Sequence, residues 1–312
     1  MLEKEILLSI CIPTINRENY LHKTLESIVS QKVFLDTYLV EIVISDNASE
    51  DNTKILCEQY TKKYFGKISY NRNLENILDL NFNKVLSLGK GKFLKLNNDT
   101  LVHKDGSLDE MLKNIQQNIT KKPILYYANG LIKNRNVILC NGLNSFISLI
   151  SFNTTWIGAF GIWREDYLDF TDFNRASTSQ LVQVDVLFRM IAKGKNILIN
   201  NNILTQSIQP EKKGGYNIFK IFVENYLNIL ESNYKAGLVN YSTVYNEKSK
   251  LMIHLIVPWY INLLSKKSNL GFVHEKSFSI IFNKYKYHPY LLIGIIYYFL
   301  RIPYHFIKFY GK

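Results

Sequence analysis

The sequence predicts an α/β protein with a mixed, mainly parallel sheet flanked by helices and with a helical extension at its carboxyl end. Two observations lead to this fold class. Apolar runs of strand length alternate with segments of helical spacing as far as about residue 205, which is typical of a parallel sheet covered on both faces. Beyond residue 206 the pattern becomes helical, basic and aromatic. We therefore expect one domain over residues 1–205 and a separate region over residues 206–312.

The first hundred residues supply most of the predicted sheet. The run "ILLSICI" is continuously apolar, and Pro13 and Thr14 are expected to end it. The helix after the second strand has Ser49 or Asp51 available as a cap. The predicted strands are 6–12, 40–46, 67–73 and 92–99, and the predicted helices are 19–31, 47–64 and 81–91.

The second hundred residues predict a more mixed arrangement. Apolar runs at 123–132 and 136–143 favour antiparallel pairing. A helical pattern over 178–194 ends at Gly194, and a late strand is expected at 196–200.

Polar side chains follow three of the predicted strands, in the segments Pro13–Arg17, Asp46–Ser49 and Asn97–Asp99. Right-handed crossovers place the carboxyl ends of parallel strands on one edge, where open α/β sheets bind ligands. We therefore expect these segments to converge on a single crevice. The alternative is local, because Thr, Asn and Asp at a strand end also serve as turn and capping residues.

Composition narrows the classes of function. Of the net charge of +12, +9 lies in residues 201–312, together with 22 of the 42 aromatic residues. The three cysteines, Cys11, Cys57 and Cys140, are far apart, which predicts neither a disulfide framework nor a zinc site and favours a cytoplasmic protein. We expect no export signal. We also expect no membrane-spanning helix, since the apolar stretch 290–300 is about half the length that such a helix requires. No basic motif with base-reading positions is present, so no nucleic-acid partner is expected.

Four segments of the chain occur together in a known family: "LLSICIPTINRENYLHKTLESIVSQ", "VEIVISDNASEDNT", "NRNLENILDLNFNKVLSLGKGKFLKLNNDT" and "GAFGIWRED". In order and spacing they resemble the family 2 nucleotide-sugar glycosyltransferases, in particular abequosyltransferase-like and rhamnosyltransferase-like enzymes of bacterial surface polysaccharides. The resemblance covers about residues 5–200. It implies a GT-A, Rossmann-like fold with a nucleotide-binding half at about 1–102 and an acceptor half at about 103–205.

The resemblance implies an inverting transfer of a sugar from a nucleotide diphosphate, most often a UDP-sugar. The acceptor would be a glycan or a lipid-linked acceptor in capsule, O-antigen or cell-wall polysaccharide synthesis. Asp46 would hold the base edge, since a carboxylate accepts from base N–H groups. The residues that the resemblance places at the nucleotide are Pro13, Thr14, Asn16, Arg17, Asp46, Asn47, Asn97 and Asn98. By contrast, Asn73, Asn76 and Asn81 are expected to act as caps.

The segment Asn97-Asn98-Asp99 falls where the family has an Asp-x-Asp motif that holds a divalent cation, Mg²⁺ or Mn²⁺, on the diphosphate. The first carboxylate of the motif is replaced by Asn97, which brings no charge. We therefore expect weaker metal affinity, with Asp99 as the essential ligand. A polar turn after the strand is the alternative.

Inverting transfer needs a base for the acceptor hydroxyl. The family's Glu-Asp pair falls on Val182 and Gln183, and neither is a base. Asp185 is the nearest carboxylate and is the expected base, although its position four residues before Arg189 equally suits an ion pair. The reserve carboxylates are Asp166, Asp169 and Asp172.

Two further segments carry expectations about partners. In "TWIGAFGIWRED", Gly158 would allow close approach of the acceptor and Trp156 would stack on its sugar; a core role for Trp156 is the alternative. The segment 290–312, which includes Arg301, Lys308 and Lys312, suits either peripheral binding to an anionic inner membrane face or a helical cap on the catalytic domain.

A second class of function would use the same fold to bind a ligand without catalysing a reaction. Asn97 and Gln183 stand where the family has carboxylates, which favours a non-catalytic protein that binds a sugar nucleotide or another polyanion.

Overall fold

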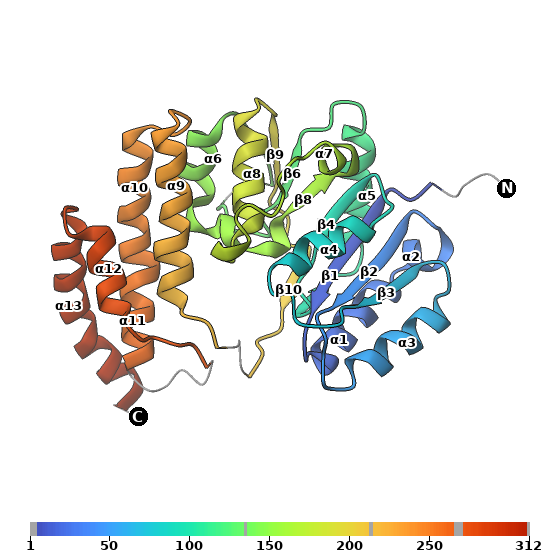
Figure 1. Ribbon diagram of the computed structural model, residues 1–312, viewed down its shortest axis with the longest axis horizontal. Helices are drawn as coiled ribbons and strands as arrows, with labels where there is room; N and C mark the ends of the chain where they lie inside the picture. The colour runs from blue at the N-terminus through green and yellow to red at the C-terminus, as the bar shows by residue number, and fades with distance from the viewer. Residues whose placement is uncertain (1–4, 134–135, 212–214, 265–270, 311–312) are drawn as a thin grey trace. The chain divides into compact units, whose positions relative to one another are not determined.

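The computed structural model describes residues 5–133, 136–211, 215–264 and 271–310 (Figure 1). The chain divides into two compact units. The first comprises residues 1–142, 156–178 and 182–209, and the second comprises residues 143–155, 179–181 and 210–312. That residues 1–205 fold as an independent domain stays a prediction.

A five-stranded sheet forms the centre of the first unit, with strand order β3-β2-β1-β4-β8. The first four strands of that order are parallel, and β8 pairs antiparallel with β4. The bounds are β1 Leu8–Thr14, β2 Val40–Asp46, β3 Ile68–Arg72, β4 Phe93–Leu96 and β8 Gly161–Trp163. This arrangement confirms the predicted fold class.

One predicted boundary is wrong, because β1 continues through Pro13 to Thr14. The strand pairs with β4 only as far as Cys11, whereas it pairs with β2 along its whole length. At Pro13 the strand therefore has a neighbour on one side only. A proline is tolerated there, since its missing N–H leaves no ladder bond unmade.

Helices cover both faces of the sheet (Figure 1). Apolar residues of α1, α3 and α5 share one core with alternate residues of β1 and β2, such as Ile10 and Ile42. On the opposite face, α4 packs against β1 and β2 and is bonded to Ser45 through Asn81. The helices of this unit are α1 Glu18–Val29, α2 Lys32–Asp36, α3 Thr53–Lys63, α4 Leu80–Leu88, α5 Ser107–Asn118, α7 Arg164–Leu168 and α8 Val182–Ala192.

Two smaller sheets complete the first unit. In one, β9 (Ile197–Asn200) lies between β6 (Ile124–Tyr127) and β7 (Val137–Cys140), parallel to β6 and antiparallel to β7. The expected antiparallel region is therefore mixed. In the other, β5 (Leu101–His103) pairs antiparallel with β10 (Thr205–Ser207). The sequence indicates a helical region from about residue 206. In the structure β10 extends to Ser207, so the helical region begins after that residue.

The described part of the second unit is almost entirely helical. Its helical elements are α6 Leu143–Ile150, η1 Ser151–Thr155, η4 Lys220–Asn225, α9 Tyr226–Lys235, α10 Tyr241–Leu251, η5 Met252–Ile256, α11 Val257–Leu264, α12 Ser277–Tyr285 and α13 Tyr290–Tyr310. Glu247 is buried where it accepts hydrogen bonds from Ser151 and Tyr226, and burial raises its pKa to about 7. Within the described residues, none of the helices has the length and apolar character needed to traverse a bilayer.

Candidate functional site

The carboxyl ends of β1, β2 and β4 meet at Thr14. The N–H of Asn47, just after β2, donates to the Thr14 carbonyl at 2.8 Å. The Thr14 hydroxyl donates to Asp99 Oδ2 at 2.9 Å. Thr14 is also paired in register with Asp46. The three polar segments therefore converge on one edge of the sheet, as the crossover argument predicts.

The loops that follow β1 and β2 are bonded to each other. The Asn16 N–H donates to Ser49 Oγ at 2.9 Å, and the Glu50 N–H donates to Asn16 Oδ1 at 2.7 Å. Asn16 has a positive φ of 50°, a conformation that asparagine tolerates better than most residues. Asn16 and Ser49 thus link the two loops, and the place of Asn16 at the nucleotide stays a prediction. Ser49 does not cap α3; instead Asp51 accepts from the N–H of Thr53, the first helical residue.

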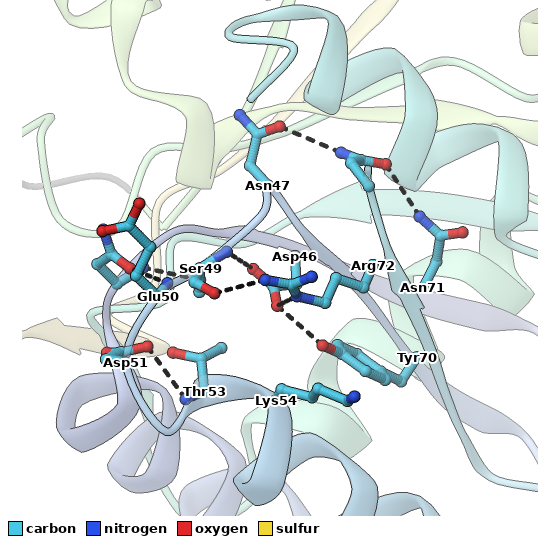
Figure 2. A network of polar contacts seen from close by, with 12 residues as sticks. Asp46, Asn47, Ser49, Glu50, Asp51, Thr53, Lys54, Tyr70, Asn71 and Arg72 are labelled. Carbon is cyan, nitrogen blue, oxygen red and sulfur yellow. Dashed lines mark hydrogen bonds and ion pairs between the residues drawn. The ribbon is translucent and has the colours of Figure 1, made fainter. Parts of the chain in front are cut away.

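Asp46 lies at the centre of a polar network (Figure 2). Its carboxylate is completely buried and accepts hydrogen bonds from the Ser49 N–H at 2.9 Å and the Tyr70 hydroxyl at 2.8 Å. The Arg72 guanidinium lies 3.5 Å from the same carboxylate and donates to the Ser49 carbonyl. A base that bonded Asp46 directly would have to displace one of these partners. Sequence analysis did not assign Tyr70 and Arg72 to the site, although both lie on a predicted strand.

Buried amides fix the position of Asn47, and they correct one prediction. The Asn73 side chain donates to Asn47 Oδ1 at 3.1 Å and to Asn81 Oδ1 at 3.0 Å. The Asn47 side chain in turn donates to Asn76 Oδ1 at 2.6 Å. None of these three asparagines caps α4, whose cap position is Asp79. Because the amides bond one another, they join β2, β3 and α4 beneath the site.

Asp99 is half-buried at the end of β4. The Thr24 hydroxyl of α1 donates to its main-chain carbonyl at 2.9 Å, so both the backbone and the side chain are held. Burial raises the pKa of Asp99 to about 6, while the Thr14 hydroxyl and the charge of Arg17 act in the opposite direction. The neighbouring Asn98 Oδ1 is buried and has no hydrogen-bond partner in the described part of the chain.

The side chain of Asn97 is held by contacts within the protein, and its place at the nucleotide stays a prediction. It is completely buried, its Nδ2 donates to the Asn98 carbonyl at 2.9 Å, and its Oδ1 lies 3.1 Å from His103 Nε2. Burial, followed by the charge of Lys95, lowers the pKa of His103 to about 3. The imidazole is therefore neutral. Since an amide oxygen only accepts, Nε2 carries the proton, and Nδ1 accepts from Ser107 Oγ at 3.2 Å.

The residues around Asp99 can be tested for their fit to a divalent cation. Among the described residues, no three His, Cys, Asp or Glu side chains cluster as a metal site would require. Asp99 supplies a carboxylate, and the adjacent residue Asn98 has an amide oxygen with no hydrogen-bond partner among the described residues. Mg²⁺ and similar ions are commonly held by one or two carboxylates together with substrate phosphates and water. The donor set therefore fits a cation that arrives with a diphosphate.

The segment expected to bind the acceptor lies beside the Asp99 loop. A Cβ on the buried Gly158 would lie 2.6 Å from the Leu101 side chain and 2.8 Å from the Trp156 ring, so a larger residue would require these side chains to shift. The Trp156 ring, half-exposed, covers this glycine. The ammonium group of Lys95 donates to the Gly158 carbonyl from β4. Lys95 is 2% exposed, and burial lowers its pKa to about 7. Sequence analysis did not single out Lys95, because a lysine in a strand is usually assumed to reach solvent.

Asp185 forms ion pairs with two arginines. An ion pair is the role that the sequence offers for Asp185 as the alternative to a catalytic base. It lies 2.6 Å from Arg175 Nη2 and 2.8 Å from Arg189 Nη2. In the described residues, both carboxylate oxygens are thus held by guanidinium groups, which stabilise the charged form. Arg189 also donates to the carbonyls of Thr171 and Asp172. This geometry favours a structural role for Asp185. Of the reserves, Asp166 pairs with Lys195, and Asp169 and Asp172 are exposed.

Comparison with known proteins agrees with this geometry. Residues 9–127 match the family "Glycosyl transferase family 2". Over 90 residues the chain is 43% identical to abequosyltransferase RfbV of Salmonella typhimurium (strain LT2), which is 28% of this chain and 26% of that protein. The chain therefore matches about a quarter of the length of this curated relative.

Two solved structures show the same fold at low sequence identity. Residues 1–349 of S. aureus TarS, solved with UDP-GlcNAc, match with a TM-score of 0.56 and 15% identity, over 84% of this chain and 80% of that one. The mannosyltransferase PcManGT of Pyrobaculum calidifontis, solved with GDP-Man and Mn²⁺, matches with a TM-score of 0.57 and 10% identity, over 85% and 77%. Residues 9–127 thus match the glycosyl transferase family 2 model, and the chain shares the GT-A fold of these solved structures.

Proposed function

We propose that this protein is an inverting glycosyltransferase that moves a sugar from a nucleotide diphosphate donor to a glycan or lipid-linked acceptor. The observation that carries the proposal is the meeting of Thr14, Asp46 and Asp99 at one edge of a family 2 domain. Similarity to the minor teichoic acid biosynthesis protein GgaB of Bacillus subtilis (24% identity over 134 residues) supports a role in cell-surface polymer synthesis, and similarity to TarS, solved with UDP-GlcNAc, supports a UDP-sugar as donor.

The nucleotide would lie along the ends of β1, β2 and β4. The base of the nucleotide would lie beside Asp46 and Asn47. It would replace one of the contacts that Tyr70 and Arg72 make with the Asp46 carboxylate. The diphosphate would lie over Thr14 towards Asp99, where Arg17 supplies a positive charge. Asn16 would shape this loop through its bonds to Ser49 and Glu50.

We assign the cation to Asp99 and Asn98, with Mn²⁺ or Mg²⁺ as the ion. When bound, such an ion neutralises the charge that develops on the leaving diphosphate. The Thr14 hydroxyl and the Thr24 hydroxyl hold the Asp99 side chain and backbone in place for it. The His103–Asn97 contact holds the preceding backbone from the protein side.

Binding of Mn²⁺ with UDP should weaken below about pH 6. Burial raises the pKa of Asp99 to about 6, so the carboxyl is protonated below that value and must lose its proton before it can hold a cation. The affinity for Mn²⁺ with UDP should not depend on pH above that value, and it should fall about tenfold for each pH unit below it. Fluorescence titration of Mn²⁺ with UDP at a series of pH values measures this. Asp99→Asn is the control and should have weak affinity with no inflection near pH 6.

The sugar of the acceptor would lie on the half-exposed ring of Trp156, which packs over Gly158 beside the Asp99 loop. The base that takes the acceptor proton would be one of the exposed carboxylates Asp169 or Asp172, since the carboxylate of Asp185 is held by two arginines. A lipid-linked acceptor would place the protein in the cytoplasm, at the inner face of the plasma membrane.

A panel of UDP-, GDP-, CDP- and dTDP-sugars separates transfer from mere binding. A donor at a hundred times its dissociation constant should stabilise the native protein by about 2.7 kcal/mol. We expect at least one donor to raise the melting temperature and also to release its nucleoside diphosphate on incubation with Mn²⁺. A donor that binds tightly with no release, with or without added glycan acceptors, would favour the non-catalytic alternative. A panel with neither binding nor release would contradict both.

A further inference from the structure

The helix α13 exposes a continuous apolar face. Leu292, Phe299 and Leu300 are 65%, 64% and 71% exposed. The other exposed apolar residues of this helix, up to residue 301, are Ile293, Ile295 and Ile296. At 3.6 residues per turn these six side chains fall on one side of the helix. The opposite side packs within the second unit, where Gly294 is against Met252 and the Tyr298 ring meets Tyr260.

The apolar face continues onto α12. Phe278 and Phe282 are exposed there, and their rings are stacked with centroids 6.1 Å apart. A cavity of about 270 Å³ separates α12 from α13 and is lined by apolar side chains of both helices, including Phe278, Ile295 and Phe299. The two helices lie beside α11 at one edge of the second unit (Figure 1). Burying so many large apolar side chains is favourable, so an exposed patch of this kind marks an interaction surface.

The charge of α12 and α13 is mainly positive. Residues 276–312 contain six Lys and Arg residues and no Asp or Glu, although the exposed Glu275 directly precedes Lys276. Lys276, Lys286 and Arg301 are exposed, whereas Lys284 is engaged by Glu231. Tyr287, which is 91% exposed, and the exposed phenylalanines add aromatic rings of the type that accumulate at membrane interfaces.

These charges decide between the partners that an apolar face can bind. A second copy of the chain would bring the same basic residues against themselves, which is unfavourable in a self-complementary interface. An anionic lipid surface offers hydrocarbon for the apolar side chains and negative headgroups for the exposed lysines and arginine of the two helices. We propose that α12 and α13 form a docking face for an anionic lipid bilayer. This proposal is independent of the sugar-transfer chemistry.

Vesicle sedimentation with the full chain tests the docking face. The wild type should bind vesicles of phosphatidylcholine mixed with phosphatidylglycerol, and should bind pure phosphatidylcholine vesicles much more weakly. The double variant Leu292→Glu/Phe299→Glu should lose at least about tenfold in partitioning, because it places charge on the apolar face. The double variant Lys286→Glu/Arg301→Glu should lose at least about 25-fold, which is about fivefold for each basic residue.

Phe65→Glu is the matched control, since Phe65 is 86% exposed in the first unit and should not change binding. If the charged variants fail to fold, Phe299→Trp reports insertion directly. Its emission should be quenched by brominated lipids more strongly than that of the wild type. Absence of vesicle binding, or no extra quenching of the Phe299→Trp variant, would overturn the proposal. So would a dimer in light scattering that Leu292→Glu/Phe299→Glu dissociates. Absence of vesicle binding by the wild type, together with intact sugar transfer to a water-soluble acceptor, would refute docking alone.

Discussion

Replacing Asp99 with asparagine should lower the rate of sugar transfer by about a thousandfold, the range observed when one charge-stabilising group is removed from an active site. Asp99 supplies the only carboxylate of the Asn97-Asn98-Asp99 segment. The asparagine can still accept from the Thr14 hydroxyl, so the loop should keep its conformation. Initial-rate measurements with saturating donor and Mn²⁺ test this expectation.

Asp109→Asn is the matched control for that substitution. It removes one carboxylate from an exposed position on α5 and should leave the transfer rate within about twofold of wild type. Melting temperatures of both variants establish that folding is intact. If Asp99→Asn transferred sugar as fast as Asp109→Asn, the assignment of the cation to Asp99 would be wrong.

Replacing Asp185 with alanine should lower the free energy of unfolding by about 1.5–3 kcal/mol, because its charge-assisted hydrogen bonds to two arginines are lost. The side chain of Arg175 is 48% exposed, so solvent compensates for part of the loss. Urea denaturation measures the effect. Asp169→Ala, at an exposed position in the same region, should change stability by no more than about 0.5 kcal/mol.

The same position distinguishes structure from catalysis. Asp185→Asn, assayed well below its melting temperature, should keep transfer within about tenfold of wild type. Loss of a general base costs about 100-fold to 10,000-fold, and we expect a loss of that size for Asp169→Asn or Asp172→Asn. A 1,000-fold loss in folded Asp185→Asn would restore this residue as the base.

The sheet and the meeting of its strand ends could be predicted from the sequence. Strands such as 40–46 are mainly apolar and end in a polar residue, and the handedness of the crossovers then fixes the edge on which Asp46 and Asp99 lie. The pairing of β10 with β5 could not be predicted in this way. Residues 205–207 are too few and too polar to show a strand period, and the partner 101–103 determines their conformation.

The interior of the site was the least predictable part. Asn73 and Asn81 have the composition of caps, but tertiary packing buries both of them among other amides. His103 is one of six histidines and stands in no motif, yet it is the partner of Asn97. A polar residue within the short apolar stretch 101–103 was the available signal. Sequence spacing identifies which residues share an edge, whereas the choice of hydrogen-bond partners depends on packing between segments far apart in the chain.

Calorimetric titration of UDP, GDP, CDP and dTDP, each with and without Mn²⁺, tests most directly whether the strand ends bind a diphosphate through a cation. We expect at least one of these nucleotides to bind the wild type, with an affinity that rises on addition of Mn²⁺, and we expect Asp99→Asn to lose that rise. Binding with equal affinity in the presence and absence of Mn²⁺, and in wild type and Asp99→Asn alike, would contradict the account. The absence of any binding would contradict it as well.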